Sequence, residues 1–435
     1  MGAATTSRPT STALDIKHSR SRVHAEPIHP GGARVLERPR FEVADVVRAL
    51  GDTFRATHAL TPAQHAVLRD IARCRTAELG GHVDVCPQVD CGYAEIAYNS
   101  CRNRHCPKCQ GIAQARWLSQ RMERMLPVDA FHVVFTLPSG LRPLVLANRA
   151  VLFNALFTAA AEALKELAKD PKYLGAEVGI TAVLHTWTRE LLFHPHVHCI
   201  VTGGGLSADG ERWIAGRRAD FLFPVRVLGA LFRGKFLARL ERLYTQGRLQ
   251  LSGPAERFAH RQAFVRLRRK LYESRWVVYA KPPFGGPEEF FRYVGRYTHR
   301  VGLSNRRILS LDGERVVFRT RGDATETLPH DEFLRRFLMH VLPDGFTKIR
   351  HYGLFAPGAA SKRLALARRR IEEAGIAPAA PTGSNAPKDF RELLLALTGV
   401  DLRQCPRCGI GLLLRRVLDT TANLPQLARG PPCAA

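Results

Sequence analysis

The sequence is poor in acidic residues and has no long apolar run. Its 435 residues include 39 Asp and Glu against 65 Lys and Arg, which gives a formal net charge of +26. A helix that spans a bilayer needs about 20 consecutive apolar residues, and the best candidate, residues 150–164, is interrupted by Asn154 and Glu162. The N-terminus also has no apolar signal region. These absences exclude membrane-spanning and secreted classes and predict a cytoplasmic protein.

The basic surplus indicates a polyanionic partner. Each phosphate that is neutralised by Lys or Arg releases counterions, and this release favours binding. Because no segment favours a bilayer over a nucleic acid, DNA is the predicted partner and the nucleoid the predicted location. Residues 1–40 are rich in Ser, Thr, Pro and Arg and show little apolar periodicity, so they are predicted to form a disordered basic arm.

Two signatures of enzymes that act on nucleic acids are missing. The sequence has no glycine-rich loop followed by Lys-Ser or Lys-Thr, which argues against an ATP-driven motor. It also offers no clear trio of dispersed carboxylates, which a DDE-type transposase would need to hold its metal ions. Any cutting of DNA must therefore depend on other residue types.

The ten cysteines are clustered, which favours metal sites over disulfides. Cys106-Pro-Lys-Cys109 has the spacing of a structural zinc half-site, because two thiolates so close in the chain can bind one ion. Cys86 and Cys91 supply a second pair, although their spacing is wider than in a tight zinc knuckle. Which residues complete the set stays open, because any of three others could replace one member: Cys101, His105 and His82.

Basic residues accompany this cysteine cluster. Arg102, Arg104 and Lys108 lie among the cysteines, so a small zinc-bound module is predicted to grip DNA ends. Much later in the chain, Cys405-Pro-Arg-Cys408 is another half-site by spacing. It has no partner pair nearby and only a distant Cys433, so a second zinc site and an orphaned half-site both stay open.

Three histidines begin an apolar run at residues 193–201. Side chains two residues apart in a strand share a face, so His194, His196 and His198 are predicted to project together. Val197 would then point the other way, into a core. Imidazoles side by side form part of a divalent-metal site.

A second pattern lies about 100 residues downstream, at residues 287–300. Pro287 suits the first turn of a helix, and Tyr293 and Tyr297 are four residues apart, so both hydroxyls lie on one helix face. A tyrosine is a poor nucleophile at its free pKa near 10, so it needs a polarised target or basic surroundings. The apolar neighbours also fit an ordinary core helix, which is the rival interpretation. Three arginines flank the tyrosines: Arg292, Arg296 and Arg300.

Taken together, these patterns resemble a known constellation. His196-Val197-His198 resembles the His-hydrophobic-His motif of HUH endonucleases, and the tyrosine pair resembles the nucleophiles of their two-tyrosine branch. The wider context resembles the rolling-circle insertion-sequence transposases of the IS91-like family over roughly residues 45–355. Four segments carry that likeness: residues 101–110, 194–207, 297–301 and 336–353.

The resemblance implies an α+β fold. HUH nucleases have a ferredoxin- or RRM-like palm, with the histidines on a central strand and the tyrosines on a helix across that face. The order strand–helix–strand–strand–helix–strand predicted here agrees with such a palm, and residues 203–205 are predicted to close the histidine strand in a flexible turn. The expected domains are a basic arm (1–40), a helical and zinc-ribbon-like DNA-binding module (41–115), the catalytic domain (116–355) and a basic tail with a half-site (356–435).

The resemblance also implies a mechanism. One tyrosine would attack a phosphodiester of single-stranded DNA and form a 5′-phosphotyrosine, while His196 and His198 hold Mg²⁺ or Mn²⁺. A third ligand is needed, and His185 and His299 both remain candidates. The pattern leaves a homo-oligomer open. Two alternatives also stay open, namely a replication initiator or relaxase with the same site, and a non-catalytic zinc-dependent DNA-binding protein.

Overall fold

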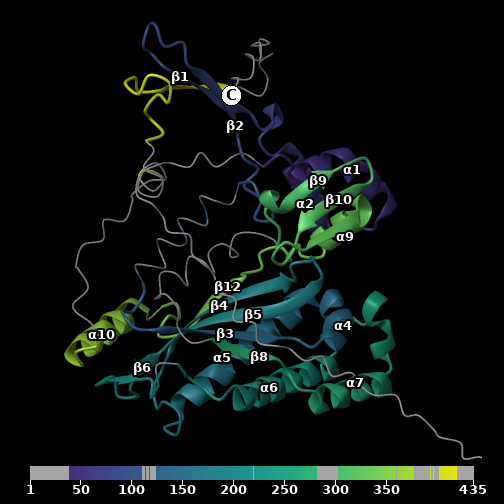
Figure 1. Ribbon diagram of the computed structural model, residues 1–435. Coiled ribbons are helices and arrows are strands. Elements are labelled where there is room, and N and C mark those ends of the chain that lie inside the picture. The colour runs from purple at the N-terminus through teal and green to yellow at the C-terminus, as the bar shows by residue number, and fades with distance from the viewer. Residues whose placement is uncertain are drawn as a thin grey trace, which may run out of the picture. The chain divides into compact units, whose positions relative to one another are not determined.

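The computed structural model describes residues 39–109, 113, 117, 124–218, 220–281, 302–358, 360–376, 392, 395 and 401–418. The chain divides into two units, Met1–Glu37 and Arg38–Ala435, and all the described residues lie in the second. Most of the predicted basic arm and the two-tyrosine helix lie outside the described residues. The rest forms three sheets of three or more strands, one hairpin and the helices around them (Figure 1).

The largest sheet has five antiparallel strands in the order β12-β4-β5-β3-β8 (Figure 1). Its strands are β3 (Ala130–Thr136), β4 (Gly179–Trp187), β5 (Phe193–Thr202), β8 (Val278–Lys281) and β12 (Ile349–Gly353). The β4–β5 hairpin lies beside β3, and β8 pairs with the far edge of β3. This interleaving is that of a split βαββαβ sheet with one added edge strand, β12. The predicted α+β class is confirmed.

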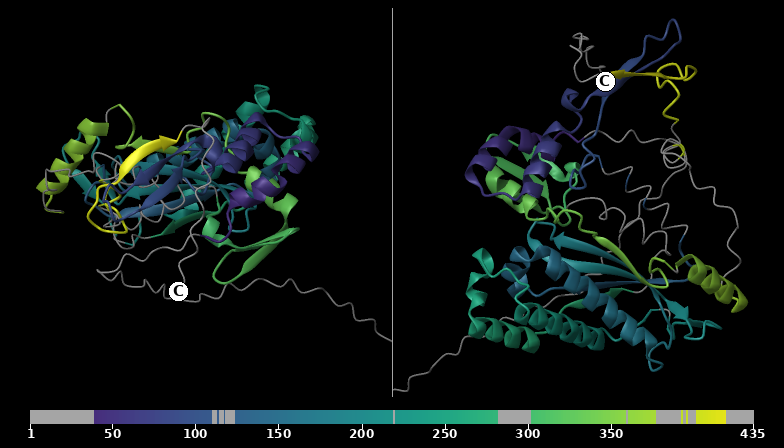
Figure 2. Two further views of the ribbon diagram at one scale, coloured as in Figure 1. Left: turned by 90° about the horizontal axis from the view of Figure 1, so that it is seen from above. Right: turned by 180° about the vertical axis from the view of Figure 1, so that it is seen from behind.

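Two long helices cover one face of this sheet. Helices α5 (Arg149–Lys169) and α6 (Val225–Thr245) pack side by side against it, as Figures 1 and 2 show. Because side chains alternate along a strand, Val197 and Cys199 face these helices and belong to the main core. Each buried aromatic or aliphatic side chain there contributes about 1.5–3 kcal/mol. The histidines of β5 therefore lie on the opposite face.

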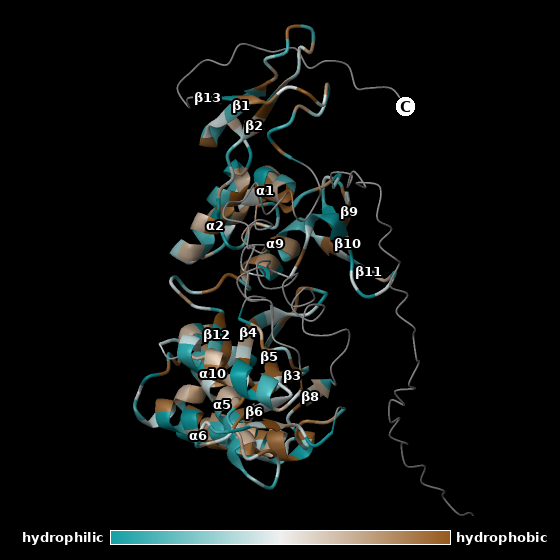
Figure 3. Ribbon diagram, turned by 90° about the vertical axis from the view of Figure 1, so that its left-hand side faces the viewer, coloured by the Kyte–Doolittle hydropathy of each residue, from teal (hydrophilic) through white to brown (hydrophobic). Residues whose placement is uncertain are grey.

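Shorter elements complete the sides of this core. They are α4 (Arg142–Ala147), α7 (Arg261–Glu273) and the 3-10 turns η2 (Ser139–Leu141) and η3 (Gly253–Ala259). The chain has extended backbone at His260, between η3 and α7. Figure 3 shows hydrophilic and hydrophobic residues mixed along α5 and α6. None of the described helices is both long and apolar enough to cross a membrane.

A second core joins the N-terminal helices to residues far along the chain. Helices α1 (Val43–Thr57) and α2 (Pro62–Arg73) pack with α9 (His330–Leu338) and with the sheet β11-β10-β9. Thr61 caps α2, because its side chain accepts a hydrogen bond from the backbone N–H of Gln64, and the Gln64 side chain accepts one from the backbone N–H of Thr61. The remaining elements of this group are η4 (Asn305–Arg307), β9 (Ile308–Leu311), β10 (Arg315–Arg319) and β11 (Thr325–Pro329).

The second core includes residues from both sides of the domain boundary that was predicted near residue 115. The sequence places α9 and β9–β11 inside the catalytic domain, whereas the structure packs them on the N-terminal helices. The physical reason is that α9 is strongly amphipathic, and its apolar face, with Phe333 and Phe337 fully buried, finds its partners on α1 and α2. Helices are matched by complementary faces and not by closeness in the chain.

The cysteine-rich segment forms a small sheet of its own, in the order β13-β1-β2. β1 (Gly81–Val85) and β2 (Ala94–Tyr98) follow the short 3-10 turn η1 (Ala77–Leu79), and the third strand is β13 (Leu414–Leu418). The segment predicted to be a separate tail from residue 356 thus contributes a strand to the N-terminal module. β13 runs antiparallel to β1 over the full length of both strands.

The glycines at 203–205 do not form the predicted turn. Gly204 and Gly205 begin strand β6 (Gly204–Leu206), which pairs with β7 (Trp213–Ala215). A Cβ atom on Gly205 would lie 2.5 Å from the carbonyl oxygen of Glu177, so close backbone approach explains the glycine there. The hairpin packs on α10 (Ala360–Glu373) through a small apolar cluster.

Candidate functional site

Strand β5 and its neighbour β4 bring three histidines together. His196 and His198 project from the face of the sheet opposite to α5 and α6, because Val197 and Cys199, which alternate with them, belong to the main core. The antiparallel register places His185 of β4 directly opposite His196. The ligand atoms of His185, His196 and His198 all lie within 4.8 Å of one another. Of the two candidates for a third ligand, His185 is thus placed with the pair, and His299 lies outside the described residues.

Hydrogen bonds orient two of these rings. His196 Nδ1 lies 2.6 Å from the backbone oxygen of His194, so this nitrogen carries the proton and donates it to the carbonyl. His198 Nδ1 lies 2.7 Å from Nε2 of His132. In both rings Nε2 is then the nitrogen that remains for a ligand, which is the usual arrangement around a protein-bound metal. His194 itself serves through its carbonyl and is not one of the three convergent rings.

Sequence reasoning did not find His132. It lies on β3, is 5% exposed, and stacks on His198 with ring centroids 5.0 Å apart. Its signal is the alternation of β3, in which Phe131 and Val133 join the main core and His132 must face the other way. Only the pairing of β3 with β5 shows that this position meets the histidine site.

Burial sets the charge state of the site. Desolvation lowers the pKa of His196 to about 4, and it lowers the pKa values of His185 and His198 well below their ordinary value. At neutral pH all three rings are therefore neutral, and each can offer a lone pair to a metal ion. Lys348 is also buried, and desolvation followed by repulsion from Arg104 lowers its pKa to about 7.

Four cysteines form a compact group at the end of α2. They are Cys74, Cys101, Cys106 and Cys109, and their sulfur atoms lie within 4.8 Å of one another. Cys101 Sγ and Cys109 Sγ are 3.6 Å apart, and Cys74 Sγ and Cys106 Sγ are 3.7 Å apart. Thiolates about 2.3 Å from one tetrahedral zinc ion would be about 3.8 Å apart, whereas a disulfide requires about 2.05 Å. The geometry fits zinc.

The predicted grouping of the cysteines is therefore wrong in two respects. Cys74 was missed, although it is the first residue beyond α2 and takes the place expected for Cys86 or Cys91. Cys86 and Cys91 instead lie with Cys405 and Cys408, so the C-terminal half-site does have a partner pair. Neither His105 nor His82 is a member of either group.

The predicted DNA-binding residues have different surroundings. Arg102 is exposed, and its backbone has a positive φ of 54°. Lys108 is exposed and pairs with Glu42 at 2.8 Å. Arg104 is half-buried and donates to the backbone oxygen of Phe346 at 2.7 Å, so its guanidinium links two segments. Three further candidates lie outside the described residues: Arg292, Arg296 and Arg300.

His105 also links the two segments. Its Nε2 accepts a hydrogen bond from the backbone N–H of Leu342 at 3.1 Å. Desolvation, followed by the nearby charge of Arg104, lowers the pKa of His105 to about 3, so the ring is neutral and can accept. The loop that carries Cys101, Cys106 and Cys109 is thereby fixed to the segment that leads into β12.

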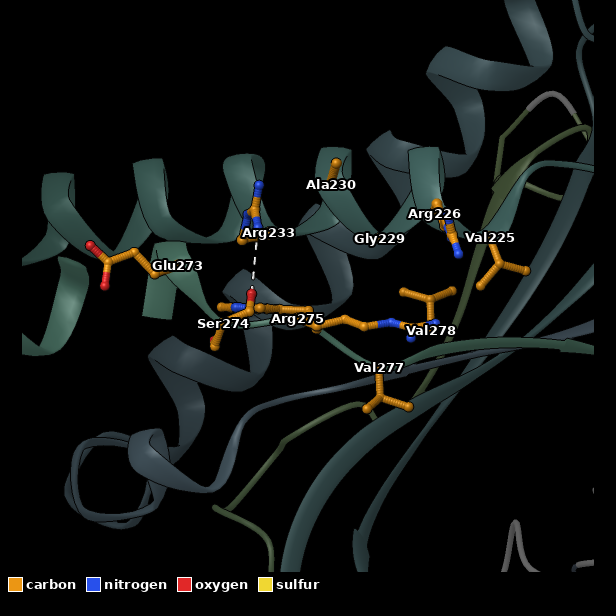
Figure 4. A pocket seen from close by; sticks show the side chains of 11 residues that line it. Val225, Arg226, Gly229, Ala230, Arg233, Glu273, Ser274, Arg275, Val277 and Val278 are labelled. Atoms are coloured by element: carbon orange, nitrogen blue, oxygen red, sulfur yellow. Dashed lines mark hydrogen bonds between the residues drawn. The ribbon is translucent and has the colours of Figure 1, made fainter. Parts of the chain in front are cut away.

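A cavity of about 540 Å³ lies away from the histidines, between α6 and the start of β8 (Figure 4). Arginines line it, and Arg233 donates to the backbone oxygen of Ser274 at 3.4 Å while its guanidinium lies over the ring of Tyr272. Because α6 covers the face opposite to the histidines, this cavity is not part of the candidate metal site. The other two arginines of its lining are Arg226 and Arg275.

Comparison with known proteins identifies the family. A family model described as "Putative transposase" matches residues 179–363, and a model described as a transposase zinc-binding domain matches residues 46–137. A "Putative transposase" of Sinorhizobium fredii is 47% identical over 404 residues, which cover 91% of this chain and 98% of that protein. The transposase for insertion sequence element IS801 of Pseudomonas savastanoi pv. phaseolicola is 31% identical over 346 residues, which cover 77% and 79%.

The chain belongs to the IS91-like family of transposases. Transposases act on DNA, and membership implies endonuclease and strand-transfer activity. The first family match contains all three convergent histidines, and the second contains Cys74, Cys86, Cys91 and the loop 101–109. Structural zinc is therefore supported both by the family and by the cysteine geometry. No solved structure gives a significant match to this transposase.

Proposed function

We propose that this transposase nicks and joins single-stranded DNA at the ends of an insertion sequence by tyrosine transesterification. The observation that carries the proposal is the convergence of three neutral histidines on the face of the sheet opposite to α5 and α6. Tyr293 and Tyr297 follow β8 in the chain and supply the nucleophiles in this proposal. In the same proposal, the five-stranded sheet is the palm of an HUH nuclease, and the element moves by rolling-circle transposition.

His185, His196 and His198 would hold a divalent cation. Such an ion, when bound, offsets the charge that develops on the attacked phosphate. A set made only of imidazoles suits Mn²⁺ better than Mg²⁺. The protein contributes orientation, because the carbonyl of His194 and the ring of His132 fix the rotation of two ligand rings. It also contributes burial, because desolvation keeps all three rings unprotonated.

The chemical step uses only groups of the DNA and of the tyrosine. The phenolic oxygen forms a bond to phosphorus, and the bond between phosphorus and the 3′ oxygen breaks. The phenol loses its proton and the departing 3′ oxygen gains one. The product is a 5′-phosphotyrosine, which keeps the energy of the phosphodiester, so a later attack by a 3′-hydroxyl can rejoin the strands without ATP. Two tyrosines would allow two such transfers.

DNA contacts complete the proposal. Arg102 on the cysteine-rich loop and the arginines beside the tyrosines would neutralise phosphates of the strand. The zinc-bound module would recognise the ends of the element, and the protein would work at the nucleoid. The four cysteines of the loop and of α2 would hold its structural zinc.

The test is a cleavage assay on single-stranded DNA that carries the end of the element, with Mn²⁺ or Mg²⁺. Products are separated on a denaturing gel for the wild type, Tyr293→Phe, Tyr297→Phe and the double variant. We expect a covalent protein–DNA adduct that persists in the wild type and is absent from the double variant. His198→Ala should slow adduct formation by about 100-fold or more, because the phosphate charge is then poorly offset.

His351→Ala is the matched control. His351 lies on β12 of the same sheet and bonds to Thr181 at 3.1 Å, but it is not one of the three convergent rings, so its adduct should form at a rate near that of the wild type. DNA binding without any adduct, unchanged by the tyrosine substitutions, would refute the nuclease proposal and leave a zinc-supported DNA-binding protein.

A further inference from the structure

A second group of four cysteines joins segments that lie far apart in the chain. Cys86 Sγ lies 3.7 Å from Cys408 Sγ, and Cys91 Sγ lies 3.6 Å from Cys405 Sγ. These partners are 322 and 314 residues apart in the chain. Cys405 and Cys408 lie outside the residues that both family models match. We propose that Cys86, Cys91, Cys405 and Cys408 hold a second zinc ion, which fastens the C-terminal segment to the N-terminal module.

The sulfur geometry supports zinc and argues against disulfides. All four sulfur atoms lie within 4.8 Å of one another, and the two short separations match the edge of about 3.8 Å in a zinc–thiolate tetrahedron. Each short separation is between a sulfur of the N-terminal pair and a sulfur of the C-terminal pair, so the four sulfur atoms surround one position. Both separations are far beyond the length of a disulfide bond, about 2.05 Å.

The backbone around the C-terminal pair is shaped for a bound ion. The backbone N–H of Gly411 points at Cys408 Sγ at 3.4 Å, and such a donor stabilises a thiolate. Gly409 has a positive φ of 69° and donates to the carbonyl of Cys405 at 2.9 Å, which closes a tight turn. A Cβ atom on Gly411 would lie 2.5 Å from Cys86 Sγ. A side chain at that position would therefore displace a ligand.

The module has too small an apolar core to hold together by packing. Among the described residues, the apolar cluster around this sheet has three buried members, Cys86, Cys91 and Cys405, with a few partly buried neighbours such as Tyr93 and Leu413. Large apolar side chains of the same segment are instead exposed, with Val417 at 84%, Ile410 at 76% and Leu412 at 63%. Small modules of this kind need a metal or a cross-link to fold.

A zinc ion here would fix β13 in place. β13 pairs with β1 from Gly81 opposite Leu418 to Val85 opposite Leu414. Arg415 of β13 also makes two hydrogen bonds to the carboxylate of Asp84, at 2.7 and 2.8 Å. Exposed ion pairs of this type contribute little by themselves, so the metal would supply most of the attachment. This inference is independent of the chemistry proposed for the tyrosines.

The experiment compares zinc content among full-length variants purified in parallel. The three variants are Cys86→Ser with Cys91→Ser, Cys405→Ser with Cys408→Ser, and all four substitutions together. If one ion binds all four residues, each variant loses the same single equivalent of zinc per chain, because removing either pair already destroys the site. Cys199→Ala is the control, since Cys199 is buried in the main core and lies in neither cysteine group. Its zinc content should equal that of the wild type.

Substitution with Co²⁺ provides a readout that the histidine site does not share. The charge-transfer absorbance from thiolate to Co²⁺ should fall by about half in each of the three variants, because one of two four-cysteine sites is lost. Unchanged zinc and absorbance in the Cys405/Cys408 variant would overturn the proposal. So would a loss in the four-residue variant twice that of either pair, which would indicate two separate sites.

Discussion

At the level of single residues, the contact between His132 and His198 fixes the rotation of one ligand ring in the candidate metal site. An imidazole that binds a metal through Nε2 needs a partner at Nδ1 to fix its rotation and its tautomer. His196 obtains this partner from its own strand, through the carbonyl of His194. His198 obtains it from the neighbouring strand β3. His132 is therefore a positioning residue that acts through His198.

Replacement of His132 by alanine should weaken Mn²⁺ binding by about 10- to 100-fold, because His198 loses the group that orients it. Isothermal titration of the metal into protein whose cysteine sites are saturated with zinc would measure the change. His132→Gln, which can still bond to His198, should recover part of the affinity. A dissociation constant equal to that of the wild type in the alanine variant would show that His132 has no positioning role.

At the level of elements, α9 belongs with helices that precede it by more than 250 residues. Phe333 of α9 is fully buried and packs edge-to-face on Phe318 of β10, with ring centroids 5.9 Å apart. The same cluster contains Val46 of α1 and Leu68 of α2. The folding of the N-terminal helices is thus coupled to a segment that follows the histidine strands in the sequence.

Phe333→Ala should destabilise this second core by about 3–5 kcal/mol, because it removes a large side chain and leaves a cavity. Native-state hydrogen exchange would report the change as faster exchange in α1 and α2, by roughly 100-fold or more. Phe264→Ala is the matched control, since Phe264 is equally buried but belongs to the main core. If Phe333→Ala leaves α1 and α2 unaffected, the two segments do not form one folding unit.

At the level of the whole molecule, the net charge of +26 dominates the expected interaction with DNA. Counterion release makes such binding steeply dependent on salt, with a slope of about 0.7 per phosphate contact on a single strand. Ion pairs between described surface residues engage some of the basic side chains. The chain nevertheless has 65 basic residues against 39 acidic ones. A large excess therefore remains for phosphates.

Affinity for single-stranded DNA should accordingly fall by roughly 100-fold or more between 50 and 200 mM salt, if about six phosphates are contacted. Fluorescence anisotropy of a labelled oligonucleotide would measure this slope. An uncharged oligonucleotide of the same sequence serves as the control and should bind weakly at both salt concentrations. Affinity that does not change with salt would contradict a role for the basic surplus in DNA binding.

Local patterns in the sequence were sufficient to predict the central strands and the histidine face. The alternation around Val197 predicted that His196 and His198 share a face, because the period of a strand is local. The third ligand could not be chosen from sequence, since the choice of His185 depends on the register between β4 and β5. The tyrosine pair remains a prediction.

The errors have a common cause in long-range pairing. Cys86 and Cys91 were grouped with the nearest half-site in sequence, whereas their partners lie more than 300 residues away. The glycines at 204 and 205 were interpreted as a turn, because their local signal does not distinguish a turn from a close approach of two backbones. Neither Glu177 nor Trp213, which crowd these glycines, is adjacent in the chain.

The pairing of β1 with β13 also bears on the order in which the protein is made. Asp84 leaves the ribosome long before Arg415, which follows it by 331 residues. The three-stranded sheet therefore cannot close until translation has passed β13. A transcript that ends early would yield a protein with the histidine strands but an open cysteine-rich module. Only chains translated through β13 would carry both the histidine strands and a closed three-stranded sheet.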